Sequence, residues 1–441
     1  MTGRAIGCLF GILMLLAAAA IAAKVGDMTA GIHGVLTENS SPELIAKGEY
    51  LAKVGDCGAC HSVPGRPPFS GGLGIRTPVG TVYTTNITPD ATYGIGDFTL
   101  ADFDRAVRFG VSRERTLYPA MPYTSYRNLA PEDVSALFAY FREGVPAAAV
   151  ANRRNAIPFP LSMRWPLTYW RWLFARAPEP YVAPAGSSPS VARGGYLVEG
   201  LGHCGECHTP RNAALALRAL TAGDGNRFLA GALIEGYFAP SLRSEGPGSL
   251  ADWTEDDIAR FLQMSANRHA ISFASMSEVI ERSTQHLTHE DALAMAAYLK
   301  TLEDPGASAP AFVPDEEEHS RLMLGDASKP GALIYLNNCA ACHRPDGKGY
   351  EGVFPSLAGN PVVLAERPDS VIAIILRGAT TPRTATTPAR FTMPALHWRI
   401  GDAGVAQVAS FVRSSWGNQA SAVTAADVRK VRARLDANAA R

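Results

Sequence analysis

Three copies of one five-residue string carry most of the reactive side chains in this chain of 441 residues. The string is Cys-x-x-Cys-His, and it occupies residues 57–61, 204–208 and 339–343. Of the seven cysteines, all but Cys8 lie in these strings. Cys-x-x-Cys-His is the sequence to which c-type haem is attached: its two thiols add to the porphyrin vinyl groups, and its histidine binds the iron. The strings therefore predict three covalently bound haem c groups.

Each reactive residue of the strings has a role in this interpretation. The thiols expected to bond haem are Cys57, Cys60, Cys204, Cys207, Cys339 and Cys342, and the first axial ligands of iron are His61, His208 and His343. Alternatives for a Cys-x-x-Cys pair are a thioredoxin-like redox pair, a structural disulfide and half of a zinc site. A redox pair needs a βαβ context and zinc needs two neighbouring pairs, so three separated copies favour haem.

The second axial ligand is expected to be a methionine. A thioether sulfur keeps the iron six-coordinate and raises its reduction potential, which suits electron transfer. We expect this methionine in a loop before the last helix of each repeat. Met121 and Met393 fit, because each precedes a proline that stiffens such a loop. They are the predicted distal ligands of the first and third haems.

The second repeat offers three methionines, Met264, Met276 and Met295. Met264 and Met295 fall on predicted helix faces, where methionine more often fills a core. Met276 lies about as far before its final helix as Met121 and Met393 do. We therefore assign Met276 as the second distal ligand, although a serine replaces the proline and His269 is a rival ligand.

A histidine bound to a metal usually donates its other ring N–H to an acceptor. Pro240 and Pro355 follow the second and third strings at positions where their backbone carbonyls would accept this hydrogen bond. Both residues also suit simple turns. The two interpretations stay open at the level of sequence.

The approach to each string is repeated along the chain. A glycine and a nearby tyrosine precede every copy: Gly48 and Tyr50, Gly194 and Tyr196, Gly331 and Tyr335. Amphipathic helices are predicted after each string, opened by Thr99 with Asp102, Pro131, Thr254 with Asp257, Thr288 with Asp291, Asp369 and Asp402. No long alternating strand pattern competes. The predicted fold is mostly α, with three tandem class I-type cytochrome c domains.

Shifts in composition predict the boundaries between these repeats. The predicted segments are a signal peptide or anchor at 1–23, domain 1 at 42–145, a Pro- and Trp-rich connector at 146–190, domain 2 at 191–303, a linker at 304–327, domain 3 at 328–418 and a C-terminal helix at 419–441. We expect the aromatic half of the connector to be packed and residues 185–189 to form a linker.

Composition and charge narrow the class of protein. Hydrophobic residues make up 47% and charged residues 19%, as in globular proteins. The 41 basic residues balance 41 acidic ones, so no overall field favours nucleic acid. Arg4 followed by an apolar run over residues 5–23 predicts export across a membrane, with cleavage or anchoring left open. No later segment is apolar enough to span a bilayer.

The chain resembles the tri-haem cytochrome c subunits of membrane-bound bacterial alcohol, gluconate and sorbitol dehydrogenases. The likeness covers nearly the whole mature chain, and it rests on the three strings and on more specific segments at residues 86–90, 118–123, 205–212 and 414–418. The resemblance implies a separate catalytic subunit, a quinoprotein or flavoprotein, as electron donor. It implies ubiquinone or a terminal oxidase as acceptor, at the periplasmic face of the bacterial inner membrane.

The same resemblance implies membrane contact through terminal amphipathic helices. Here Val428, Val431 and Leu435 would share one face of a basic C-terminal helix. Such a helix suits a membrane surface, but a thin apolar face also suits an ordinary solvated tail.

Under this interpretation the chain is an electron-transfer subunit with no catalytic residues and no substrate-oxidising site of its own. One alternative is a haem enzyme of the di-haem peroxidase type, which needs an iron with an open position. Others are a free-standing electron carrier and a protein that holds zinc. A methionine for every haem argues against the peroxidase.

Overall fold

The computed structural model describes residues 11, 14–15, 17–18, 40–113, 115–243, 250–302 and 312–440. The predicted signal segment at 1–23 lies largely outside them. The chain divides into two compact units, Met1–Val182 and Ala183–Arg441, which are described separately. Helix predominates, and the strands in the described residues form only two-stranded antiparallel hairpins. The mostly α prediction is therefore confirmed.

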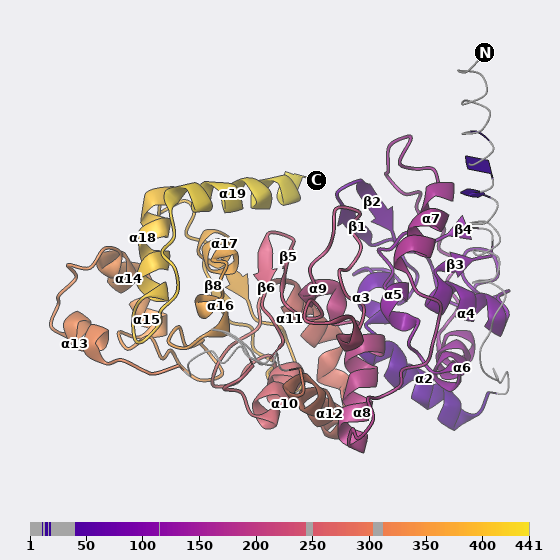
Figure 1. Cartoon of the computed structure of the whole chain (residues 1–441), viewed down its shortest axis with the longest axis horizontal. Helices are drawn as coiled ribbons and strands as arrows, with labels where there is room; N and C mark the ends of the chain where they lie inside the picture. The colour runs from indigo at the N-terminus through magenta and orange to yellow at the C-terminus, as the bar shows by residue number, and fades with distance from the viewer. Residues whose placement is uncertain are drawn as a thin grey trace, which may run out of the picture. The chain divides into compact units, whose positions relative to one another are not determined.

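The first unit contains the first Cys-x-x-Cys-His string and the aromatic connector (Figure 1). Its helices are α2 (Pro42–Val54), α3 (Cys57–His61), α4 (Leu100–Phe109), α5 (Tyr123–Tyr126), α6 (Pro131–Ala139), the π-helical turn η1 (Tyr140–Gly144) and α7 (Trp165–Phe174). Its hairpins are β1 (Gly74–Thr77) with β2 (Gly80–Tyr83), and β3 (Val111–Ser112) with β4 (Arg115–Thr116).

The second unit contains the other two strings. The helices of its first half are α8 (Pro189–Tyr196), the π-helical turn η2 (Leu197–Leu201), α9 (Gly205–His208), the short 3₁₀ turns η3 (Ala222–Asp224) and η4 (Thr284–His286), α10 (Glu255–Met264), α11 (Ala274–Arg282) and α12 (His289–Lys300). Those of its second half are α13 (Glu317–Met323), α14 (Ala332–Asn338), α15 (Ala340–His343), α16 (Pro361–Leu364), α17 (Asp369–Arg377), α18 (Asp402–Arg413) and α19 (Ala425–Ala440). Its hairpins are β5 (Ala232–Ile234) with β6 (Tyr237–Ala239), and β7 (Ala379–Thr380) with β8 (Thr392–Met393).

Side-chain caps begin the helices where the sequence predicted them. In α4, the hydroxyl of Thr99 accepts from the backbone N–H of Asp102, and the carboxylate of Asp102 accepts from the backbone N–H of Thr99, each at 3.1 Å. The same reciprocal pair opens α10. At α12 the hydroxyl of Thr288 caps the helix, and Asp291 accepts two 2.8 Å hydrogen bonds from Arg193 of α8. The third cap thus ties two helices together.

The first helix of each repeat packs across the last helix of that repeat through its glycine. The contacting pairs are α2 with α6, α8 with α12, and α14 with α18. A Cβ at the glycine of the first helix would overlap a backbone carbonyl oxygen of the last helix; the pairs are Gly48 with Ala136, Gly194 with Ala294, and Gly331 with Gln407. Gly48 and Gly194 lie inside their helices, where glycine costs about 1 kcal/mol relative to alanine, so their presence indicates a need for close backbone approach. Gly331 is the N-cap of α14 with a φ of 91°, a conformation that itself favours glycine.

An aromatic residue completes each crossing. The Cβ of Tyr140, Tyr298 or Phe411 lies 2.7, 2.8 or 2.9 Å from the position that a Cβ on the facing glycine would take. The repeated glycines of the sequence therefore mark one helix crossing built three times, in both units of the chain.

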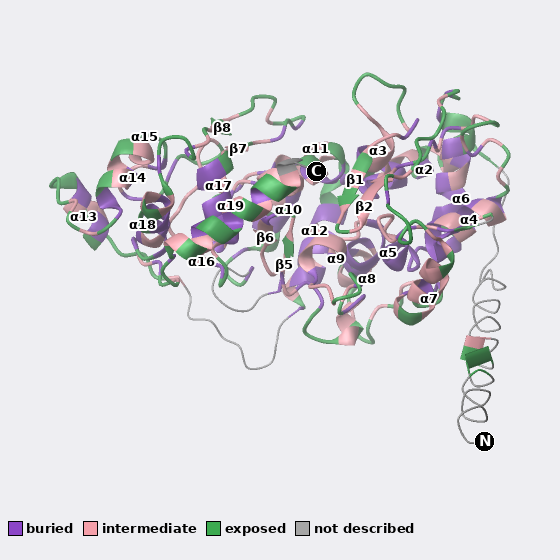
Figure 2. Cartoon of the chain, turned by 90° about the horizontal axis from the view of Figure 1, so that it is seen from above, coloured by how far each residue is buried: buried purple, intermediate pink, exposed green. Residues whose placement is uncertain are grey.

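The apolar face of α19 is buried inside the second unit (Figure 2). Val428, Val431 and Leu435 are 0%, 2% and 7% exposed, and the helix packs on α17 and α18. Arg432 pairs with Asp402 at 2.7 Å, and Arg434 pairs with Asp369, so its basic residues contact the first turns of those two helices. The face that would enter a bilayer is occupied by the protein's own core.

The aromatic connector differs from its prediction. We expected a packed segment, but Trp165 and Leu173 of α7 are 63% and 60% exposed. The physical reason is the direction of the helix face, because polar side chains at and within α7 are bonded to the rest of the unit and hold the helix with Trp165 and Leu173 outward.

Candidate functional site

Each Cys-x-x-Cys-His string folds as a single helical turn. His61 ends α3, His208 ends α9 and His343 ends α15, and the first cysteine of each string lies in the turn or caps it. One turn brings the first cysteine and the histidine to the same side of the helix, because residues i and i+4 share a face. The structure therefore brings together the residues of every predicted attachment site.

The cysteines of all three strings are free thiols. Burial raises the pKa of Cys57, Cys204 and Cys339 to about 12, so these three stay protonated at neutral pH. A disulfide alternative finds no support in these pairs.

The histidines are held by backbone carbonyls. Nδ1 of His61 donates to the carbonyl of Thr85 at 2.7 Å, and Nδ1 of His208 donates to that of Pro240 at 2.7 Å. In the third repeat, Nδ1 of His343 donates to the carbonyl of Pro355 at 3.0 Å. A carbonyl only accepts, so Nδ1 carries the proton and Nε2 presents its lone pair. The roles predicted for Pro240 and Pro355 are confirmed.

These histidines are in the form that binds a metal. Burial lowers the pKa of His61, His208 and His343, against the opposing effect of the hydrogen bond that each ring donates. A neutral imidazole whose Nδ1 is fixed by an acceptor has its ring orientation and tautomer set in advance. All three rings are therefore prepared to ligate iron through Nε2.

The predicted distal methionines of the first and third repeats lie in short non-helical segments. Met121 lies in a tight turn before α5, where its carbonyl accepts from the backbone N–H of Tyr123 at 2.9 Å. Met393 lies in β8, paired with Ala379 of β7. Met393 and Cys339 are both partly buried and pack against the same hydrophobic core.

In the second repeat the predicted distal methionine does not lie in a loop. Met276 is the third residue of α11, a helix that the sequence did not predict, and is partly buried. Met295 is 2% exposed within α12, as expected of a core filler. The rival His269 stacks on Trp253 at 5.0 Å between ring centroids, and its Nε2 lies 3.4 Å from a carboxylate oxygen of Asp257. These contacts engage His269 within its own repeat and leave Met276 as our assignment.

Comparison with known proteins decides the family. Residues 328–416 match the cytochrome c family model. The chain is 46% identical to the gluconate 2-dehydrogenase cytochrome c subunit of Pantoea cypripedii, over 92% of this chain and 93% of that one. It is 44% identical to the cytochrome c subunit of the alcohol dehydrogenase (quinone) of Gluconacetobacter polyoxogenes, over 92% and 88%. The fructose dehydrogenase cytochrome subunit of Gluconobacter japonicus is 35% identical, over 88% and 82%.

The chain belongs to this family of dehydrogenase cytochrome c subunits. Its function is accordingly electron transfer, and its cytochrome c domain binds haem c covalently. The third string fits the group: Cys339 caps α15, Cys342 lies within it, and His343 presents Nε2. The first and second strings show the same donor set and the same histidine hydrogen bond.

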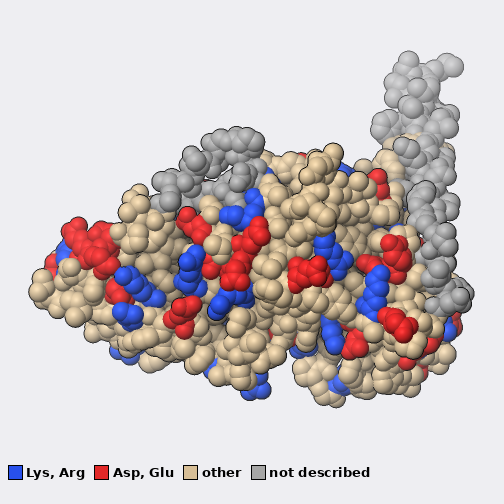
Figure 3. Space-filling view, turned by 90° about the horizontal axis from the view of Figure 1, so that it is seen from below, with Lys and Arg blue, Asp and Glu red and all other residues tan. Residues whose placement is uncertain are grey.

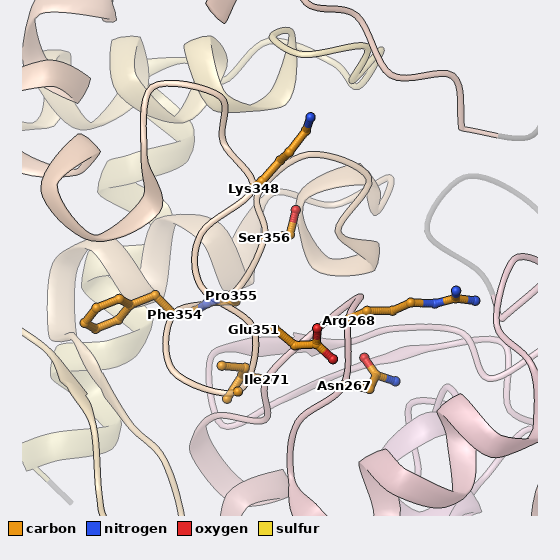
Figure 4. A pocket seen from close by; sticks show the side chains of 9 residues that line it. Asn267, Arg268, Ile271, Lys348, Glu351, Phe354, Pro355 and Ser356 are labelled. Atoms are coloured by element: carbon orange, nitrogen blue, oxygen red, sulfur yellow. The ribbon is translucent and has the colours of Figure 1, made fainter.

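The third repeat of this cytochrome c subunit meets the second repeat beside its histidine. Residues 267–271 of the second repeat face residues 348–356 of the third across a cavity of about 160 Å³ (Figure 4). Asn360 joins the two sides, because its Nδ2 donates to the carbonyl of His269 at 3.2 Å and to that of Ser356 at 2.8 Å. Ser356 directly follows Pro355, the acceptor for His343. The second repeat thus helps to hold the proximal side of the third site.

This junction gives a testable expectation. Asn360→Ser keeps a side-chain oxygen for the backbone N–H of Val362 but removes both donated hydrogen bonds. A less fixed Pro355 carbonyl polarises His343 less, so the ferric state loses stabilisation. We expect the reduction potential of the third haem to rise by tens of millivolts, on the order of 20–50 mV, in a spectroelectrochemical titration. An unchanged third potential, or an equal shift of every haem, would contradict the role of Asn360.

Sequence reasoning did not find Thr85 or Asn360. Thr85 acts through its backbone carbonyl, and any residue at that position supplies one. Asn360 acts between two repeats, because its bonded partner His269 lies 91 positions earlier in the chain. Its only sequence signal is an asparagine before a proline, which predicts the start of α16 and nothing more.

Proposed function

We propose that the protein is an exported tri-haem electron relay between a dehydrogenase subunit and the respiratory chain. It takes electrons from a quinoprotein or flavoprotein subunit and passes them to ubiquinone or a terminal oxidase at the periplasmic face of the inner membrane. The observation that supports three haems is the threefold recurrence of one arrangement: a glycine-mediated helix crossing, a motif turn, and a histidine whose Nδ1 donates to a carbonyl.

The proposed attachments follow the strings. Cys57 and Cys60, Cys204 and Cys207, and Cys339 and Cys342 bond the three haems, and the proposed axial pairs are His61 with Met121, His208 with Met276, and His343 with Met393. Each haem supplies one-electron chemistry through its iron. The chain supplies neutral, oriented imidazoles and the pairs of thiols that fix where each haem is attached. No residue acts as acid, base or nucleophile in this function.

The names of the relatives support the choice of partners. They are cytochrome subunits of dehydrogenases of gluconate, alcohol and fructose, and one name specifies a quinone. Because the chain spans most of their length, we propose that it serves a catalytic subunit of the same general class. The proposed domains are those of the sequence, at 42–145, 191–303 and 328–418, because a helix crossing falls in each.

Haem stoichiometry tests the proposal. We expect three haems per chain from a pyridine haemochrome assay of the full chain made in a host that matures c-type cytochromes. Cys204→Ser with Cys207→Ser removes both thiols of the second site and should leave two. A count of one or two for the unaltered chain would contradict the tri-haem proposal. Co-purification with its large subunit, followed by haem reduction on adding that subunit's substrate, tests the electron donor.

A further inference from the structure

Helix α7 of the connector is turned with its polar side toward the protein. The guanidinium of Arg164 donates to the carbonyl of Thr116 at 3.1 Å, and the hydroxyls of Thr168 and Thr116 lie 3.0 Å apart. One turn on, Arg171 is 2% exposed and donates to the carbonyl of Phe109 at 3.2 Å. These positions, spaced by four and three residues, form one face of the helix. Polar groups therefore anchor α7 to the first unit.

The opposite side of α7 is aromatic and reaches solvent. Trp165, Tyr169, Trp172 and Leu173 follow the i, i+4, i+7, i+8 spacing of a single face. Trp165 and Leu173 are 63% and 60% exposed, and Figure 2 shows most of α7 as intermediate or exposed. The rings of Trp165 and Tyr169 pack edge to face at 5.9 Å, so they form one continuous surface.

The residues before α7 extend this surface. Phe159 is 81% exposed and Leu161 is 52% exposed. We call the whole set the aromatic patch: Phe159, Leu161, Trp165, Tyr169, Trp172 and Leu173. Phe159, Leu161, Trp165 and Leu173 are exposed, and Tyr169 and Trp172 are half-buried. An exposed group of large apolar side chains marks a contact surface.

The charge of the segment identifies the surface that it fits. Residues 144–178 contain no Asp or Glu but five arginines, at positions 153, 154, 164, 171 and 176. Arg164 and Arg171 face the protein, whereas the other three, Arg153, Arg154 and Arg176, are exposed and so accessible to headgroups. On the face of the molecule in Figure 3, by contrast, acidic and basic side chains are intermingled. Tryptophan and tyrosine collect at the boundary between lipid headgroups and acyl chains, and arginine is attracted to anionic headgroups. An apolar face with basic flanks is the pattern of a helix lying in a membrane surface.

We propose that the aromatic patch seats the protein on the surface of an anionic lipid bilayer. The patch enters the headgroup layer, and Arg153 and Arg154, both exposed, belong to the same segment of the chain. No helix in the described part of the chain is long and apolar enough to span a membrane, and the apolar face of α19 is already buried. This inference rests on the proposed membrane location and names the surface that makes the contact.

Radical footprinting of the full three-haem protein tests the contact directly. Vesicles of phosphatidylcholine and phosphatidylglycerol should lower the oxidation of Trp165 by at least about threefold, because a side chain in the headgroup layer is shielded from aqueous radicals. Pure phosphatidylcholine should protect it less. Trp398, which is 73% exposed, is the internal control and should be oxidised equally with and without vesicles. Equal oxidation of Trp165 with and without anionic vesicles would overturn the proposal.

Matched variants test whether the membrane contact depends on the aromatic patch or on any exposed apolar residue. In Trp165→Ser with Leu173→Ser, the vesicle protection of Phe159 should be largely lost, since each side chain removed takes apolar area from the contact. Trp398→Ser should leave that protection unchanged. Protection of Phe159 by the partner dehydrogenase subunit alone, and not by vesicles, would reassign the patch to a protein interface. Haem content, measured on the same samples, reports on the proposed function separately.

Discussion

Replacing Gly194 by alanine is expected to destabilise the second repeat by about 3 kcal/mol, at the upper end of the usual cost of overpacking a core. The added methyl group would overlap the carbonyl oxygen of Ala294 and lie 2.8 Å from the Cβ of Tyr298. Both obstacles belong to the backbone or its first side-chain atom, so a rotamer change cannot relieve them. Helices α8 and α12 must separate instead. Hydrogen exchange of their amides, followed by mass spectrometry, measures the local loss of stability.

The control for this prediction lies in the same repeat. Gly223 has a nearest neighbour 3.6 Å from the position of an added Cβ, which is ordinary van der Waals contact, so Gly223→Ala should change stability by less than about 0.5 kcal/mol. Equal protection of α8 in the two variants would show that the close helix approach is not needed. The prediction also bears on the other repeats, because Gly48 and Gly331 face carbonyls in the same way.

Local signals in the sequence were enough to predict most of the fold. The capping pairs at Thr99 and Thr254 fix helix starts within a few residues, and the structure places α4 and α10 directly after them. Gly48 and Gly194, inside helices at the same point of two repeats, signal a packing constraint that no local rule explains. The motif histidines were recognisable because covalent attachment demands strict spacing. Each of these features depends on residues close together in the chain, so it can be recognised from a single sequence.

Features that depend on distant partners were not predictable in the same way. The period of α7 shows two faces, but not that Arg164 and Thr168 find partners at Thr116 and so turn the aromatic face outward. The thin apolar stripe of α19 suits a bilayer or a core equally well, and the surface that α17 and α18 offer decides between them. Met276 was expected in a loop because no capping residue in the nearby sequence predicts α11. The helix begins after Phe273 without a side-chain cap.

Replacing Met276 by alanine should lower the reduction potential of the second haem by roughly 0.1–0.3 V, a substantial part of the range that axial ligands span. Removing the thioether leaves the iron without the ligand that favours its ferrous state. A spectroelectrochemical titration measures the shift, and the weak near-infrared absorption of sulfur-ligated ferric haem should decrease by one haem's share. The reduction potentials of the first and third haems should not change, because Met121 and Met393 are unaltered.

Two variants of the other methionines decide whether this assignment is right. Met264 ends α10, and Met295 is 2% exposed in α12, so Met264→Ala and Met295→Leu should leave the second potential unchanged. If His269→Ala raises the potential and Met276→Ala leaves it unchanged, His269 is the ligand, and the stacking of that ring on Trp253 does not persist once haem is attached. A bis-histidine iron sits at a lower potential than a histidine–methionine one. The ligand at this position therefore determines whether the second haem accepts electrons as readily as its neighbours, and with it the direction of flow through the chain.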